Sequence, residues 1–239
     1  MRYRIVLACL LMVFAGPAAA QSALTIDART VIVESPNAPG PVKKAADDLA
    51  SDMAKVFGAR PQIVPASSGP AIEIASPAGG SSESFAIAAR GNHVVLSGAD
   101  VRGTIFAIYT FAQDYLGVDP MYYWNDSQPP KKTSITIPAG LSRNFPSPLF
   151  KYRGVFTNDE DQLTGWAPGE QSDHSGISRQ VEDKIFETIL RLKGNMIVPG
   201  TWTFSSDPQM KWAGERGLIL NQHHAIPLGM NVARWPANV

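Results

Sequence analysis

Four consecutive polar residues, an amide followed by three carboxylates, come just after residues 150–156, which we expect to form a short buried strand. Carboxylic acids can give and take protons during catalysis, and several of them close together shift one another's pKa. Enzymes built on parallel strands place such acids where a strand ends. A solvated acidic turn has the same composition, so the interpretation depends on the segments that come later in the chain. The four residues are Asn158, Asp159, Glu160 and Asp161.

Two further groups of candidate residues follow the next two apolar segments. Trp202 comes after residues 195–199, and the pair His223 and His224 comes after residues 218–220. If the three segments are adjacent parallel strands, all three groups lie at one edge of a sheet. Acids, an aromatic ring and imidazoles together are typical of sites that bind and cleave carbohydrates. A tryptophan such as Trp202 is also an ordinary core residue, and that interpretation stays open.

The histidine pair does not predict a metal site. Adjacent side chains on an extended backbone point to opposite sides, so His223 and His224 cannot readily bind one ion. No spacing typical of zinc ligands accompanies them, and we expect neither a metal nor another cofactor. One of the two is expected to face the polar edge and to donate to a substrate hydroxyl or carboxylate. Trp166, in a polar loop, is a further candidate for contact with a sugar.

The elements before these candidates predict a small domain over residues 21–138. Short β-branched segments alternate there with two apolar helical patterns. Pro41 opens the first helix and Gly58 ends it, while Asp100 and Gly117 bound the second. This alternation favours an α/β domain in which helices pack on a sheet.

The candidate residues themselves belong to a second region, residues 150–239. Residues 139–149, with their Pro, Gly and Ser, are expected to be a linker. After them the order strand, helix, strand, helix, strand predicts parallel strands joined by right-handed crossovers. Arg153, on the first strand, is expected to pair with an acid inside the sheet, in a structural role. A closed barrel of eight such units takes about 250 residues, so we expect the first three units of a truncated barrel, the front part of a longer polypeptide.

The first 20 residues predict an export signal. Arg2 and Arg4 precede an apolar stretch too short to span a membrane, and a run of alanines fits a cleavage site. Without these two arginines, 19 basic residues face 21 acidic ones, so nothing indicates nucleic acid binding. The one cysteine, Cys9, leaves with the signal. These features are typical of a periplasmic or secreted bacterial enzyme that has no membrane attachment after processing.

Several of these segments resemble a known family. Residues 151–161 resemble the opening of the catalytic barrel of glycoside hydrolase family 115, the xylan alpha-1,2-glucuronidases. Residues 185–195 resemble its first barrel helix with the following turn, and residues 221–227 resemble its double-histidine segment. Many members carry a Glu after the histidines, where this chain has Ala225. The region before residue 139 is similar to the small α/β domain that precedes barrels in alpha-glucuronidases and beta-hexosaminidases.

The resemblance implies removal of (4-O-methyl-)glucuronic acid from xylan-derived polysaccharides or oligosaccharides, with inversion of configuration. An inverting site holds an acid and a base about 6.5–9.5 Å apart, with a water between them. The general acid is expected beyond Val239, so this stretch alone is expected to be inactive. A homodimer of the full-length protein stays open.

The resemblance also implies roles for the candidate residues. One carboxylate positions or activates the water, with two alternates, an amide binds a hydroxyl, and an imidazole meets the substrate. Two other interpretations remain: a beta-hexosaminidase with the same front domain, or a non-catalytic carbohydrate-binding protein on a degenerate barrel. The catalytic candidates are Asp159 first, then Glu160 and Asp161, and the substrate-binding candidates are Asn158, Trp166, Trp202, His223 and His224.

Overall fold

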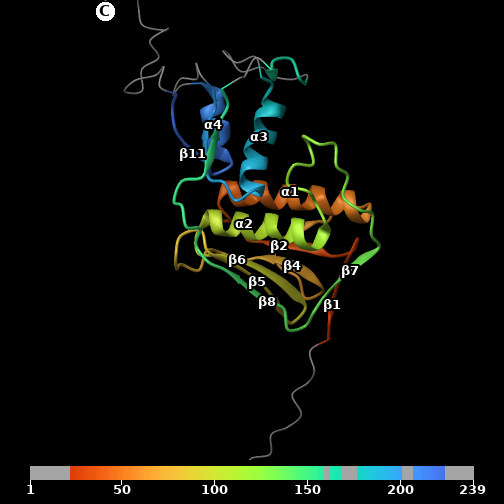
Figure 1. Ribbon diagram of the computed structural model, residues 1–239. Helices are drawn as coiled ribbons and strands as arrows, with labels where there is room; N and C mark the ends of the chain where they lie inside the picture. The colour runs from red at the N-terminus through yellow and green to blue at the C-terminus, as the bar shows by residue number, and fades with distance from the viewer. Residues whose placement is uncertain (1–21, 159–161, 168–176, 201–206, 224–239) are drawn as a thin grey trace, which may run out of the picture.

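A six-stranded sheet forms the base of the molecule (Figure 1). The computed structural model describes residues 22–158, 162–167, 177–200 and 207–223. The strands lie in the order β3-β2-β4-β6-β5-β8. The first four are parallel, whereas β5 pairs antiparallel with β6 and with β8. Their bounds are β2 (Val31–Glu34), β3 (Ile63–Val64), β4 (Ala71–Ile74), β5 (Phe85–Arg90), β6 (His93–Gly98) and β8 (Ser142–Phe145).

Helix α1 (Gly40–Phe57) packs on this sheet as predicted. Pro41 occupies its first turn, where a missing N–H does no harm, and Gly58 ends it in the left-handed conformation. Its apolar residues recur at helical spacing and face the core. The buried ones are Val42, Ala45, Ala46, Leu49, Ala50, Met53 and Val56.

Helix α2 (Val101–Phe111) lies beside α1 on the same face of the sheet (Figure 1). Asp100 caps it, because its carboxylate accepts a 2.8 Å hydrogen bond from the N–H of Gly103. The last turn continues as a π-helical turn, η1 (Ala112–Leu116), which Gly117 ends in the left-handed conformation. The mixed α/β architecture predicted for this region is therefore present.

Part of the segment predicted as a linker, residues 139–149, is instead the edge strand β8. Its Phe145 ring stacks on Phe85 of β5, with ring centroids 4.3 Å apart and planes 9° apart. Backbone pairing with β5, this aromatic contact and the ion pair of Arg143 with Asp114 hold the strand. The neighbouring Pro and Gly residues obscure the short strand pattern in the sequence. A separate antiparallel pair joins β1 (Leu24–Asp27) to β7 (Ser134–Ile137).

Three parallel strands form a second sheet on the far side of α1 and α2. Their order is β11-β10-β9, and helices connect them in the predicted succession. In Figure 1 the connecting helices stand on α1 and α2, opposite the six-stranded sheet. The elements are β9 (Gly154–Phe156), α3 (Arg179–Arg191), β10 (Met196–Val198), α4 (Pro208–Glu215) and β11 (Ile219–Leu220).

The first of these strands differs from its prediction. The sequence predicted a buried strand over residues 150–156, but only Gly154–Phe156 is paired. Phe150, Tyr152 and Val155 are 70%, 55% and 52% exposed. The reason is that β10 is the one neighbour that β9 has among the described residues.

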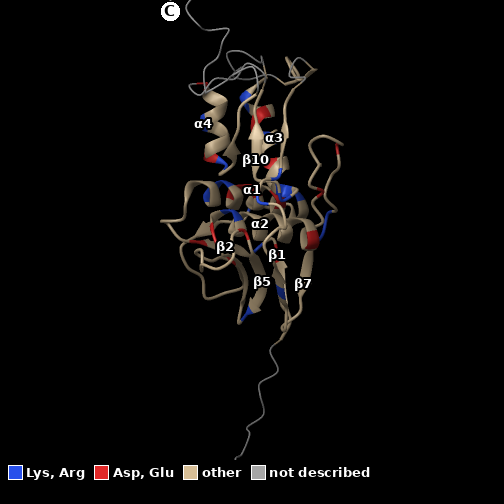
Figure 2. Ribbon diagram, turned by 60° about the vertical axis from the view of Figure 1, so that its left-hand side comes forward, with Lys and Arg blue, Asp and Glu red and all other residues tan. Residues whose placement is uncertain are grey.

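A buried ionic network joins the two parts of the chain. Figure 2 shows acidic and basic residues together where α3 and α4 stand on α1 and α2. Arg191 of α3 pairs with Asp52 of α1 and with Glu187. Arg216, at the end of α4, pairs with Asp48 of α1 and also approaches Glu187. The side chains of Arg191, Glu187 and Arg216 are at most 2% exposed, so these ion pairs lie inside the protein, beside the apolar core that the βα units share with the front helices.

Candidate functional site

The C-terminal ends of β9 and β11 meet at one edge of the second sheet, which we call the rim. Both strands pair in parallel with the central strand, β10. The N–H of Thr157 donates to the carbonyl of Val198, and the N–H of Asn221 donates to the carbonyl of Ile197. The rings of Phe156 and His223 then lie 4.7 Å apart across that central strand, tilted by 35°. The rim thus joins segments that are far apart in the sequence.

His223 is the predicted site residue that the structure places most firmly. It is 9% exposed and packs its ring against Phe156. An imidazole held in this way keeps a defined orientation, which a group that donates to a substrate requires. Within the described part of the chain, no group of three or more His, Cys, Asp or Glu side chains is arranged to hold a metal ion.

The other predicted site residues divide into two sets. Asn158 is exposed directly after β9, at the rim. Trp166 lies elsewhere, because its ring packs beside Trp124 of the front region, with centroids 6.3 Å apart. The structure therefore brings His223 and Asn158 to the end of one sheet and places Trp166 in a different cluster. Asp159, Glu160, Asp161, Trp202 and His224 lie outside the described residues.

A buried carboxylate that the sequence did not single out anchors the opposite end of the strands. Glu83 lies in a loop of the front region, 4% exposed, with a backbone φ of 62°. Its oxygens accept hydrogen bonds from Arg102 and Arg153 at 2.6 Å and from Asn195 at 2.7 Å. Burial acts to raise its pKa, but these donors outweigh burial and hold the pKa of Glu83 below its ordinary value.

This anchor determines how β9 and β10 begin. The amide oxygen of Asn195 accepts a 2.9 Å bond from the N–H of Arg153, and the N–H of Asn195 donates to the carbonyl of Arg153 at 2.7 Å. The predicted structural pairing of Arg153 with an acid is present, although the acid comes from the front region. Glu83 thereby links the front region to the register in which the rim strands pair.

Gly154 is required at this crossing. A Cβ atom added there would lie 2.1 Å from the carbonyl oxygen of Met196, on the neighbouring strand. A glycine inside a strand pattern is the kind of signal that indicates a close backbone approach. The pairing of β9 with β10 therefore depends on this residue type.

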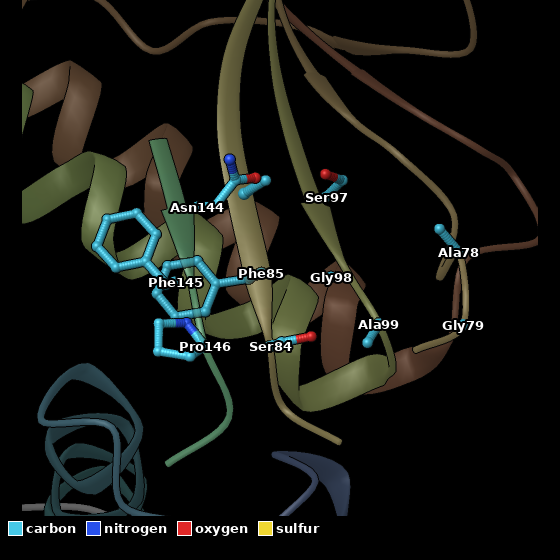
Figure 3. Close-up of a pocket in the computed structure, with 11 residues that line it drawn as sticks. Ala78, Gly79, Ser84, Phe85, Ser97, Gly98, Ala99, Asn144, Phe145 and Pro146 are labelled. Atoms are coloured by element: carbon cyan, nitrogen blue, oxygen red, sulfur yellow. The ribbon is translucent and has the colours of Figure 1, made fainter. Parts of the chain in front are cut away.

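The front region also carries a hollow, near the ends of β5, β6 and β8 (Figure 3). Its volume is about 420 Å³, and the stacked rings of Phe85 and Phe145 form one wall. Ser84, Ser97 and Asn144 are its polar side chains. The described residues that line it include no acid, base or histidine, so it offers no group for proton transfer.

Comparison with known proteins finds a family that is similar to the part of the chain that carries the rim. The model of glycosyl hydrolase family 115 matches residues 146–238. No curated protein sequence matches the chain significantly. A solved GH115 4-O-methyl-alpha-glucuronidase, BtGH115A, with specificity for decorated arabinogalactans, is 24% identical with a TM-score of 0.76. The match covers 87% of this chain and 30% of that one.

Two further solved structures share the fold at lower identity. A family 20 beta-N-acetylglucosaminidase is 16% identical with a TM-score of 0.52, and the match covers 85% of this chain and 39% of that one. The N-acetyl-beta-hexosaminidase of Streptomyces plicatus is 11% identical with a TM-score of 0.57, covering 84% and 42%. The chain therefore spans less than half the length of these three proteins.

The family match and the geometry fall on the same stretch of chain. Residues 146–238 include β9, β10 and β11, the polar residues after β9 and the His223 segment. Over these residues, the chain is similar to glycosyl hydrolase family 115.

Proposed function

We propose that this chain is the front part of a glycoside hydrolase that removes (4-O-methyl-)glucuronic acid side chains from glucuronoxylan. The observation that carries the proposal is the contact between Phe156 and His223. It brings the ends of β9 and β11 together within the residues that match the family. On this proposal β9, β10 and β11 are the first three strands of a (β/α)8 barrel, whose active sites lie at the C-terminal ends of the strands. The front region is then the α/β domain that precedes the barrel.

The proposed reaction inverts the configuration of the sugar. Asp159 activates the attacking water as a base, with Glu160 and Asp161 as alternates, and the acid that protonates the leaving oxygen comes from a further part of the polypeptide. The substrate is a uronic acid, so the imidazole of His223 is suited to donate to its carboxylate. Asn158 hydrogen-bonds a sugar hydroxyl.

We also propose that residues 1–20 are an export signal and that the protein is periplasmic or secreted. The support is the basic start, the short apolar core and the alanines that end at residue 20. No helix in the described ranges combines the length and the apolar character that crossing a bilayer demands.

The test uses the full-length protein from the continued reading frame. It is incubated with glucuronoxylan and with short uronic acid-bearing xylo-oligosaccharides, and released glucuronic acid is measured by chromatography. Early ¹H NMR spectra identify the first anomer. Inversion of the α-linkage yields β-glucuronic acid first, whereas the α-anomer contradicts inversion.

Matched variants separate the parts of the proposal. Asp159→Ala is expected to lower kcat by at least about a hundredfold, the contribution typical of a general base. Asp47→Ala, which removes an exposed carboxylate on α1, serves as the control. Full activity of Asp159→Ala rejects the assignment of the base. Absence of glucuronic acid release by the intact enzyme rejects the hydrolase, and release of N-acetylglucosamine from chitobiose favours the hexosaminidase.

A further inference from the structure

Three aromatic side chains from two separate loops form one cluster on the surface. Tyr123 and Trp124 belong to the loop between η1 and β7, and Trp166 belongs to the loop between β9 and α3. The rings of Tyr123 and Trp124 meet edge to face at 5.0 Å, and Trp166 lies 6.3 Å from Trp124 at 59°. Trp166 is 58% exposed, and the other two are half-buried. We call this cluster the aromatic surface.

The central ring of the aromatic surface is held from beneath. The indole N–H of Trp124 donates a 2.8 Å hydrogen bond to the hydroxyl of Thr188 on α3. The indole therefore has a fixed orientation, and its one polar atom is already bonded. What remains for a ligand is the ring itself, whose face carries partial negative charge.

The loops on both sides are ordered by their own hydrogen bonds. The carboxylate of Asp119 accepts from the N–H of Met121 at 2.8 Å and from the side-chain amide of Asn125 at 2.9 Å. On the other side, the N–H of Trp166 closes a turn onto the carbonyl of Leu163 at 3.1 Å. Because the rings are arranged before any ligand arrives, binding loses little conformational entropy.

The chemistry of the aromatic surface selects a neutral sugar chain. The C–H groups on the faces of a β-linked pyranose are weakly positive and flat enough to lie on an aromatic ring. Residues 118–130 and 162–167, the parts of the two loops that carry the rings, contain no lysine or arginine, but they do contain Asp119 and Asp126. Lys55 and Lys184, which approach the neighbouring Tyr122 ring, already pair with Asp52 and Glu187. A uronic acid would therefore meet the two loop carboxylates, whereas an uncharged main chain meets no such repulsion.

The aromatic surface is also connected to the rim. The loop that follows β9 begins with Thr157 and Asn158 at the rim, and the same loop carries Trp166. We propose that the aromatic surface is a second carbohydrate-binding site, which holds the neutral main chain of a β-linked polysaccharide near the rim. The inference deepens the proposed function and rests on it, since it explains how a polymer whose side chain is cleaved would be held by its main chain.

The test measures binding apart from catalysis. Full-length protein is titrated by calorimetry with xylohexaose, cellohexaose and β-galactohexaose, none of which carries a uronic acid. Trp166→Ala is expected to weaken binding of at least one of them about tenfold, which corresponds to about 1.4 kcal/mol. Tyr152→Ala is the matched control, since Tyr152 is an aromatic residue of similar exposure, 55%, on the segment that leads into β9 rather than in the loop that follows it.

Kinetics supply the second readout. For Trp166→Ala and Tyr123→Ala, KM on polymeric glucuronoxylan is expected to rise about tenfold while kcat stays unchanged. Both constants should stay unchanged on an aldouronic acid with a single xylose. Binding of all three hexasaccharides equal to that of the wild type in both variants overturns the inference.

Further outcomes separate this inference from the proposed function. If Asp159→Ala binds xylohexaose normally, the aromatic surface acts independently of the rim, as expected. If glucuronic acid is released but Trp166→Ala binds and turns over polymer normally, the aromatic surface alone is rejected. If no glucuronic acid is released but hexasaccharide binding depends on Trp166, the proposed function alone fails. Iodide quenching of tryptophan fluorescence, compared between the wild type and Trp166→Ala, shows whether iodide reaches the Trp166 ring. If the ring is protected from iodide in the free full-length protein, another part of the polypeptide covers it, and the proposed site is overturned.

Discussion

Arg191 of α3 donates a 2.7 Å hydrogen bond to Asp52 of α1, and the two side chains are 2% and 1% exposed. The same guanidinium donates to Glu187 at 2.7 Å. A buried ion pair adds little stability relative to an apolar contact, but removal of one partner strands a charge in a medium of low polarity. Removal of a charged partner from either the front region or the βα units is therefore expected to destabilise both.

Glu187→Gln is expected to destabilise the protein by about 3–5 kcal/mol, because the variant removes the carboxylate that Lys184 and Arg191 share and leaves Arg191 with Asp52 alone. Although burial acts to raise it, the pKa of Glu187 is lowered to about 2, chiefly by Arg191 and Lys184. Urea unfolding at pH 7 measures the loss. Glu215→Gln, whose carboxylate is 40% exposed, should change stability by less than about 0.5 kcal/mol. Equal stability of the two variants would contradict the importance of the network.

The contribution of Asp52 to the free energy of unfolding is expected to fall as the pH rises. Burial raises the pKa of Asp52 to about 6, although Arg191 acts to lower it. The folded state therefore holds this proton more tightly than the unfolded chain does. The stability from Asp52 is full below about pH 4 and is lost as the pH rises to about 6.

Asp52→Asn has no carboxyl group that could ionise. The stability of the variant relative to the wild type should therefore increase between pH 4 and pH 6, by up to about 1.4 kcal/mol per pH unit, and then level off. Urea unfolding curves recorded across pH 4–7.5 measure this difference. Parallel stability curves for the two proteins would show that Asp52 titrates normally.

Gly154→Ala is expected to disrupt the pairing of β9 with β10, because the new methyl group would overlap the carbonyl of Met196. Overpacking of this kind costs about 1–3 kcal/mol. Hydrogen exchange should show faster exchange of the Asn195 amide, which donates to Arg153. Gly140→Ala is the control, since nothing lies within 4 Å of a Cβ atom there. Unchanged exchange at Asn195 would mean that the pairing of β9 with β10 tolerates a methyl group at residue 154.

Glu83→Gln is expected to cost about 1.5–3 kcal/mol, because two arginines lose a charged acceptor. The lowered pKa of Glu83 means that its contribution is present above its ordinary pKa and is lost as the pH falls. The wild type should therefore lose its advantage over the variant in acid. Thermal unfolding at pH 7 and pH 3 measures both values, and an equal gap at the two pH values would count against the anchor.

Much of the fold was predictable because the relevant forces are local. Pro41 and Gly58 bound α1, Asp100 caps α2, and apolar residues at helical spacing face the core. The strand–helix succession after residue 150 likewise predicted parallel pairing, and β9, β10 and β11 pair in that way. Strand β8 was missed because its stability comes from β5 and from the Phe85 ring, which no local pattern records.

The candidate site was predictable in part. The placement of polar residues at strand ends predicted that His223 and Asn158 would share the rim with β9, and the contact of His223 with Phe156 agrees. The assignment of a carbohydrate contact to Trp166 remains a prediction, although its position beside Trp124 is new. The three carboxylates at residues 159–161 lie outside the described residues, so their roles stay predictions.

The sequence by itself determined where the helices and most of the strands form, and which chemical groups follow the strand ends, because caps, turns and apolar spacing act over a few residues. Only the tertiary structure decided the partners that lie far apart in the chain. Glu83 meets Arg153 and Asn195, Arg191 meets Asp52, and Trp124 meets Trp166. The physical reason is that a charge or ring exposed in the unfolded chain gains these partners only when the front helices and the βα units pack together and exclude water.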